Sequence, residues 1–344
     1  MSEGRQQATA ASVAGAVMPG PGDGASAQGG TSPVAPLDVV VTVDALGEFA
    51  RAVGAGAVTV TNIVPAGMEP HDFEPKATDM MKIADADVFI YNGLGMDSWV
   101  GEVLEAVGNP RLVAVEASAG AELIGLAGDT GLYDAGGEIS HIGGSAGTAT
   151  ANGTDGADGA DDAGIAFDGG AHPEDGYDPH VWLGISGAKA QAANIAAALC
   201  EADPARRGSY EANLQAFRGE LDALKSRYED VFAQAPRRIF VTGHAAFGYL
   251  CKEFGLEQVS VEGVFAEGEP NARQLAALTE YCRENRVTVV FAEEMAAPQV
   301  SEALAREVGA RVETIYTMES AQDGKTYLER MGENLEKIAG SLYE

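Results

Sequence analysis

The chain has 344 residues, of which 46% are apolar, and this is enough for two globular domains with cores of their own. Its formal net charge of −30 argues against nucleic acid as a partner, because phosphate binding depends on clustered Lys and Arg. The three scattered cysteines exclude a C-x-x-C zinc or redox motif, and no apolar run approaches the roughly 20 residues of a membrane span.

The first lobe is predicted from an alternation of strands and helices. Residues 1–36 are rich in Gly, Ala, Ser and Pro and are expected to form a disordered tether. The run "LDVVVTV" is a strand, "LGEFARAVG" a helix and "AVTVTNIV" a second strand, which is typical of a parallel α/β unit. A helix, a strand and a further helix follow, the last capped by Asp97 or Ser98. We expect this lobe to span residues 37–184.

An acidic, glycine-rich insert interrupts this lobe at about residues 120–176. It contains repeated Asp-Gly dipeptides and is far longer than an ordinary connection, so most of it is expected to lack fixed structure. It offers His141 and His172 among many aspartates. Hard oxygen ligands of this kind predict weak, auxiliary collection of cations.

Helical periodicity then continues through residues 185–232, with an interruption at Asp203-Pro204. Because proline is tolerated in a first turn or at a kink, this segment is either one long bent helix or two abutting helices. After it, strands and helices alternate again to the end of the chain. The patterns therefore predict an α/β protein in which one long helix joins the first lobe to a second lobe of residues 233–344.

Three of the five histidines occupy comparable places in this pattern. His71 in "PAGMEPHDFEPKATD", His180 in "DPHVWL" and His244 in "VTGHAAFGYL" lie at or just after a predicted strand end, or at the mouth of the next loop. Ligands of open parallel sheets bind at the carboxyl ends of strands. Any one of these histidines alone is better interpreted as a structural residue, but the three together favour a metal site.

Four stretches together resemble one known family: "VPAGMEPHDFEPKATDMMKIADADVFIYNGLGMDSWV", "DPHVWL", "GHAAFGYLCKEFGLEQVSVEG" and "FAEEMAAPQVSEALAREVG". They are similar to the metal-specific solute-binding proteins of bacterial ABC importers, in the zinc and manganese branch. The resemblance covers nearly all of residues 37–344 except the insert. It implies two (β/α)4-type lobes with parallel sheets, one long rigid helix between them, and a metal ion in the cleft between the lobes.

Carried over by residue, the resemblance implies His71, His180 and His244 as metal ligands and Glu319 in "IYTMESAQDG" as the fourth. Glu293 and Glu294 in "FAEEM" are the competing candidates, although in the family this pair supports the site. Three imidazoles favour Zn²⁺, while Mn²⁺ prefers more oxygen ligands and remains the alternative. Affinity order alone would also admit copper or nickel.

The resemblance implies a monomer outside the cytoplasm, lipid-anchored or periplasmic, that captures a free ion and delivers it to an ABC permease. A zinc hydrolase is the alternative from another class, because three histidines with an open position also form a catalytic site. The absence of an H-E-x-x-H motif and the presence of a fourth protein ligand argue against it. The acidic tether and insert also suggest an adhesin or a scaffold. Since neutral imidazoles bind metal, affinity should fall on acidification through about pH 6.5.

Overall fold

The computed structural model describes residues 35–126, 176–265, 272–294, 298–320 and 323–344. The predicted tether, except its last two residues, and most of the predicted insert, with both of its histidines, lie outside these ranges. The chain from Pro36 to Glu344 groups as one compact unit, to which both sheets below belong. Among the described helices, none combines the length and the apolar character that a membrane crossing requires.

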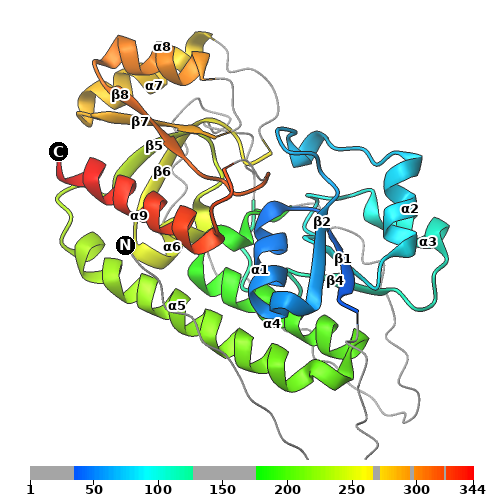
Figure 1. The fold of residues 1–344 in the computed structure, drawn as a ribbon. Coiled ribbons are helices and arrows are strands. Elements are labelled where there is room, and N and C mark those ends of the chain that lie inside the picture. Colours follow the sequence, from blue (N-terminus) through cyan, green and yellow to red (C-terminus); the bar gives the residue numbers. More distant parts are fainter. Residues whose placement is uncertain (1–34, 127–175, 266–271, 295–297, 321–322) are drawn as a thin grey trace, which may run out of the picture. The chain divides into compact units, whose positions relative to one another are not determined.

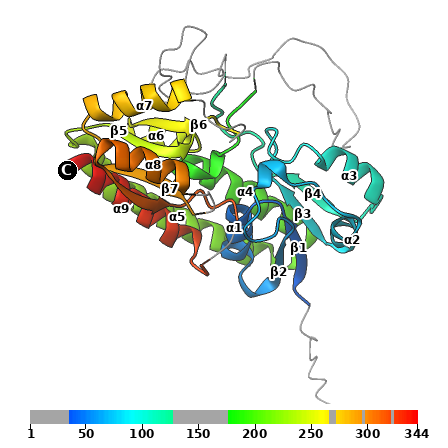
Figure 2. The same ribbon diagram turned by 90° about the horizontal axis from the view of Figure 1, so that it is seen from above.

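The first sheet contains four parallel strands in the order β2-β1-β3-β4 (Figures 1 and 2). Its strands are β1 (Leu37–Val41), β2 (Val58–Asn62), β3 (Val88–Tyr91) and β4 (Val113–Glu116). Its helices are α1 (Asp44–Gly54), α2 (Ala77–Asp85) and α3 (Val100–Val107), with the 3-10 turn η1 (Ala55–Ala57) before β2. Because all strands run in one direction, their carboxyl ends share one edge, as the sequence pattern predicted.

The second sheet repeats this arrangement in the order β6-β5-β7-β8, again with all pairs parallel. Its strands are β5 (Ile239–His244), β6 (Glu257–Glu262), β7 (Val289–Glu293) and β8 (Arg311–Ile315). Its helices are α6 (Gly248–Phe254), α7 (Ala272–Glu284), α8 (Gln299–Val308) and α9 (Tyr327–Tyr343). The expected α/β class with two lobes of parallel strands is thus confirmed.

The connection between the lobes is two helices, α4 (Ile185–Ala202) and α5 (Arg207–Ala233), and not one continuous helix. The 3-10 turn η4 (Pro204–Arg206) separates them, where proline cannot donate a backbone hydrogen bond and the Asp203 carboxylate accepts from Ala205 N (3.1 Å). Helix α4 packs on α1, β4 and α6, and α5 packs on α1, α6 and α9 (Figures 1 and 2). The connector therefore contacts helices of both lobes.

One apolar core runs through both lobes and the connector. Alternating residues of β1 face opposite sides, so Val39 and Val41 join this core while Val40 packs in a smaller cluster with Phe89. Trp182 belongs to the main core, is fully buried, and donates from its indole nitrogen to the carbonyl of Thr317 (2.7 Å). This contact of Trp182 with the segment after β8 ties the two lobes together.

The described ends of the insert lie against each other. Gly125 and Tyr177 form an antiparallel bridge, and Leu126 N donates to the carbonyl of Gly176 (2.8 Å). Backbone pairing therefore orders the two margins of the insert. The expectation for most of the insert concerns residues outside the described ranges. The chain leaves and re-enters the lobe at adjacent points.

Candidate metal centre

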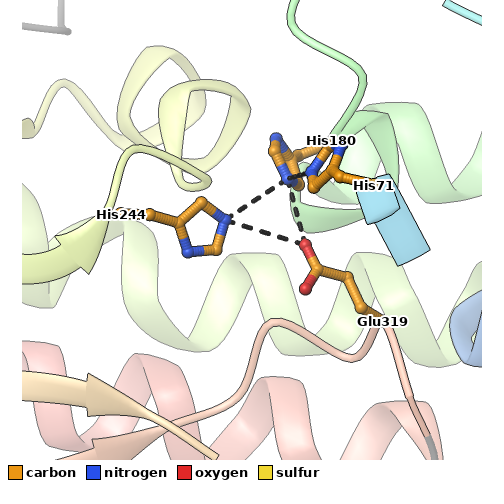
Figure 3. A group of neighbouring side chains, drawn as sticks. All are labelled: His71, His180, His244 and Glu319. Carbon is orange, nitrogen blue, oxygen red and sulfur yellow. Dashed lines mark hydrogen bonds and ion pairs between the residues drawn. The ribbon is translucent and has the colours of Figure 1, made fainter. Parts of the chain in front are cut away.

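Four side chains with metal-binding atoms converge in the described structure (Figure 3). His71 lies in the 3-10 turn η2 (Pro70–Asp72), and His180 immediately precedes the 3-10 turn η3 (Val181–Leu183). His244 is the last residue of β5, and Glu319 lies in the loop after β8. One ligand atom from each lies within 4.8 Å of the others. The structure thus brings together all four residues that the sequence analysis singled out.

The separations of these atoms fit a small ion with four ligands. His180 Nε2 lies 3.4 Å from His71 Nε2, 3.5 Å from His244 Nε2 and 3.0 Å from Glu319 Oε1. Glu319 Oε1 lies 3.7 Å from His244 Nε2. A tetrahedral ion with bonds of about 2.0–2.1 Å separates its ligand atoms by roughly 3.3 Å. These four separations lie close to that value, and all four ligand atoms lie within 4.8 Å of one another.

His180 is oriented by a neighbouring carboxylate. Asp178 Oδ1 lies 2.9 Å from His180 Nδ1 and also accepts the backbone N–H of His180 at 2.9 Å. Both residues are almost fully buried. When the Nδ1 position carries the proton, Nε2 is free to face the other ligand atoms, and an acceptor of this kind makes the imidazole a better ligand.

His244 is positioned by residues of three strands. Glu293 Oε1, at the end of β7, accepts the backbone N–H of His244 (2.9 Å) and lies 3.7 Å from its Nδ1. The Gln258 side-chain amide of β6 donates to the His244 carbonyl (2.8 Å). Gly243 permits this packing, because a Cβ there would lie 2.1 Å from the Glu293 carboxylate. Glu293 thus lies behind His244 and outside the group of four.

The loop that carries Glu319 is anchored to the first lobe. The backbone N–H groups of Asp44 and Ala45, at the start of α1, donate to the carbonyls of Glu319 (2.9 Å) and Met318 (3.0 Å). Met318 has a left-handed backbone, with φ of 59°. Such a conformation is unfavourable for a side chain and persists where surrounding contacts enforce it.

Carboxylate and hydroxyl contacts complete the support of this loop. Glu294 accepts the N–H groups of Thr317 (2.8 Å) and Met318 (2.9 Å), and the Thr317 hydroxyl donates to Glu319 Oε2 (3.0 Å). Glu294 therefore holds the backbone that presents Glu319 and does not itself join the group of four. The positions of Glu293 and Glu294 agree with supporting roles for both.

Burial and charge set the protonation of the four groups. Burial lowers the pKa of His71 to about 3, helped by the neighbouring His180. Burial also lowers the pKa of His244, but the contact with the Glu293 carboxylate and the charge of Glu319 outweigh it and raise the pKa to about 9. For His180, contacts with Asp178 and Glu319 likewise outweigh burial and raise its pKa. The neighbouring carboxylates therefore favour the protonated forms of His244 and His180, whereas burial favours the neutral form of His71.

Glu319 and Glu69 have opposite shifts in this field. Burial raises the pKa of Glu319, but the hydrogen bond with His180 and the charges of His244 and His180 outweigh it, so its pKa is lowered. Glu69, two residues before His71, has a raised pKa because of burial and the charge of Glu319. Its Oε1 is buried and has no hydrogen-bond partner in the described structure. Glu319 is therefore the ionised carboxylate of the site.

Sequence reasoning did not identify Asp178, Thr317, Glu69 or Phe265 as neighbours of the site. Asp178 stands two residues before His180, so its spacing could have suggested the contact. Phe265 follows β6, and its ring centroid lies 5.5 Å from that of His71. No local pattern predicts this contact, because it depends on how the two lobes face each other.

Comparison with known proteins identifies the family. The profile described as "Zinc-uptake complex component A periplasmic" matches residues 39–341. A Treponema pallidum (strain Nichols) protein named for metal binding is 38% identical over 302 residues, covering 88% of this chain and 86% of its own. The high-affinity zinc uptake system protein ZnuA of Bacillus subtilis (strain 168) is 32% identical over 311 residues, covering 89% and 88%.

Solved structures agree with this assignment. The Zn(II)-bound ZnuA-like domain of Streptococcus pneumoniae AdcA has a TM-score of 0.67 at 26% identity, covering 90% of this chain and 100% of its own. The laminin-binding protein Lmb of Streptococcus agalactiae, described as bifunctional with adhesin and metal transporting activity, has a TM-score of 0.70 at 29% identity, covering 89% and 99%. The present chain therefore belongs to the family of periplasmic zinc-uptake components, which are solute-binding proteins of zinc import and not enzymes.

Proposed function

We propose that this protein captures Zn²⁺ outside the cytoplasm and delivers it to an ABC permease for high-affinity uptake. In this proposal the ion is the cargo, and His71, His180, His244 and Glu319 are its ligands. Membership of the zinc-uptake family supports the transport role, and the zinc-bound structure of a relative supports the choice of metal.

The observation that carries the proposal is the convergence of three imidazoles and one carboxylate within 4.8 Å. Zinc takes imidazole nitrogen readily and prefers four ligands in closed sites, whereas manganese prefers more oxygen. Mn²⁺ is therefore the alternative cargo. Four protein ligands leave no open position for a nucleophilic water, so the arrangement favours storage of an ion over hydrolysis.

The division of the chain fits a carrier that closes by small movements. We propose residues 37–184 and 233–344 as the two lobes, with residues 185–232 as the connector. Bonds from the start of α1 to the loop of Glu319, and the packing of the connector on both lobes, favour small loop and lobe shifts over a wide hinge. We propose that the protein acts as a monomer and is either lipid-anchored or free in the periplasm.

The likeness to the bifunctional laminin-binding protein supports a second candidate function, adhesion at the cell surface. It does not exclude metal capture, since that protein's own description combines the two. Binding of the purified chain to immobilised laminin, with and without zinc, tests it. Absence of saturable binding would reject adhesion to laminin and leave the transport proposal untouched.

Metal competition tests the main proposal. We expect the purified chain, stripped of metal, to bind one Zn²⁺ tightly and to prefer it over Mn²⁺ in competition with a chelator of known affinity. His180→Ala should weaken zinc binding at least 100-fold, and Glu319→Ala should cost less because water can take the fourth position. His172→Ala, a histidine outside the proposed set, is the matched control. Preference for Mn²⁺ would refute zinc as the cargo. An unchanged zinc affinity in His180→Ala would refute the proposed ligand set.

A further inference from the structure

Phe265 lies over the least buried ligand of the candidate site. It stands three residues beyond β6, in the second lobe, and its ring meets that of His71 edge to face, with centroids 5.5 Å apart and planes at 84°. Of the four proposed ligands, His180, His244 and Glu319 are buried, whereas His71 is only partly so. The His71 side is therefore where the site approaches solvent, and Phe265 covers it.

The Phe265 ring also lies near a loop of the first lobe. Gly93, Leu94 and Gly95 have φ values of 83°, 58° and 85°, and a Cβ at Gly95 would lie 3.9 Å from Phe265 Cε1. The buried Asp97 carboxylate holds this loop, accepting the N–H groups of Asn92 (2.6 Å) and Gly93 (2.8 Å). Phe265 therefore lies close both to a proposed ligand, His71, and to a loop position, Gly95, that has no side chain.

The Asp97 contacts make this loop a firm support. The Thr42 hydroxyl, just after β1, also donates to Asp97 (2.7 Å), so the loop is tied to the carboxyl end of the sheet. The left-handed backbone of Leu94 is unfavourable for a branched side chain and requires such contacts to persist. Movement at this place is thus expected of the Phe265 side chain, and not of the loop.

We propose that Phe265 sets the rate at which zinc enters and leaves the site. Its ring screens the His71 side from water, so an ion must displace the ring to reach or to leave the ligands. An apolar cover controls solvent access to a metal site without contributing a ligand. Removing it should therefore change both rates in the same direction while leaving the ligand set intact. This inference rests on the proposed zinc binding.

Exchange kinetics of the full chain test this role. In this test, stopped flow compares wild type with Phe265→Ala. It measures zinc release to a chromogenic chelator and zinc uptake by the metal-free protein. Association and dissociation rates should both rise at least tenfold, with the equilibrium Kd changing less than threefold. Phe265→Tyr keeps the ring and should retain wild-type rates. Met81→Ala, which truncates an apolar side chain that is 65% exposed, is the control.

Two results would overturn the inference. One is that both rates of Phe265→Ala stay within twofold of wild type. The other is that dissociation and Kd rise in equal proportion with association unchanged, which would mean that Phe265 only stabilises the loaded state. If Phe265→Ala does not fold by circular dichroism, Phe265→Leu replaces it, with an expected rise of at least threefold in both rates. Failure of the proposed function is distinct, since the wild type itself would then take up no zinc.

Discussion

Through His244 alone, acidification should weaken zinc binding by up to tenfold per pH unit below about pH 9, because protons and zinc compete for the imidazole of this residue. The pKa of this ring is raised to about 9 by contacts with Glu293 and Glu319 that outweigh burial. Above about pH 9 the ring is neutral and the zinc affinity no longer depends on its protonation. Below about pH 9 the ring must lose a proton before zinc binds. At pH 7, two units lower, this costs about 2.7 kcal/mol, or roughly 100-fold in Kd.

The other two imidazoles act differently. His180 also has a raised pKa, so its protonation further lowers the zinc affinity on acidification. His71, with a pKa of about 3, stays neutral and adds none in the working range. The fall in affinity predicted from unperturbed histidine near pH 6.5 should therefore begin at higher pH, and binding at pH 7 should release at least about one proton per zinc.

Titration calorimetry in buffers of different ionisation enthalpy counts the released protons, and chelator competition from pH 6 to 8.5 gives the slope of log Kd. Glu293→Gln keeps an acceptor for the His244 N–H but removes the charge, so it should reduce proton release at pH 7. Glu302→Gln makes the same change at an exposed position on α8 and should release protons as wild type does. A Kd constant within threefold between pH 8 and 6, or zinc uptake without proton release, would refute the reasoning.

Three further changes probe the surroundings of the site. Asp178→Ala should weaken zinc binding about 10–100-fold in chelator competition, since His180 loses the acceptor that orients it, and unchanged affinity would contradict this. Arg330→Met should lower the free energy of unfolding in urea by about 3–5 kcal/mol, because the buried Asp44 carboxylate loses its partner, and a loss below about 1 kcal/mol would be inconsistent. Deleting residues 130–170 should leave zinc affinity within tenfold, because Gly125 and Tyr177 already hold the ends of the insert together, and a larger loss would make the insert part of the high-affinity site.

The fold was predictable where a strand is a buried apolar run and a helix has one apolar face. Strands β1, β3, β5 and β7 coincide with such apolar runs. The alternation of strands and helices within each lobe was visible in the order of these patterns along the sequence. The short strand β4, "VAVE", was not predicted, because four residues beside the insert carry little pattern. The break between α4 and α5 at Pro204 was left open between a bend and a separation, since proline permits both.

The candidate ligands were predictable as a set only through the resemblance, because the sequence alone marks three histidines and no fourth partner. What local reasoning could not supply is tertiary support. Asp97 was expected to cap the helix that follows, yet α3 begins at Val100 with no side-chain cap. Its carboxylate instead accepts the N–H groups of Asn92 and Gly93, at the start of the left-handed turn before it, and so provides a partner for the donor of the buried Asn92.

The two sheets share one strand order, so each strand of the first has a counterpart in the second: β1 and β5, β2 and β6, β3 and β7, β4 and β8. His180 comes after β4 and Glu319 after β8. A nitrogen donor and an oxygen donor therefore occupy equivalent positions in two lobes with the same strand order. The equivalent positions after β2 and β6 are occupied by His71 and by Phe265, whose ring lies over His71. These positions lie outside the strands, so a side chain at any of them can be substituted without altering either sheet. Two lobes of this kind can therefore acquire a new metal preference, or a new exchange rate, through single substitutions.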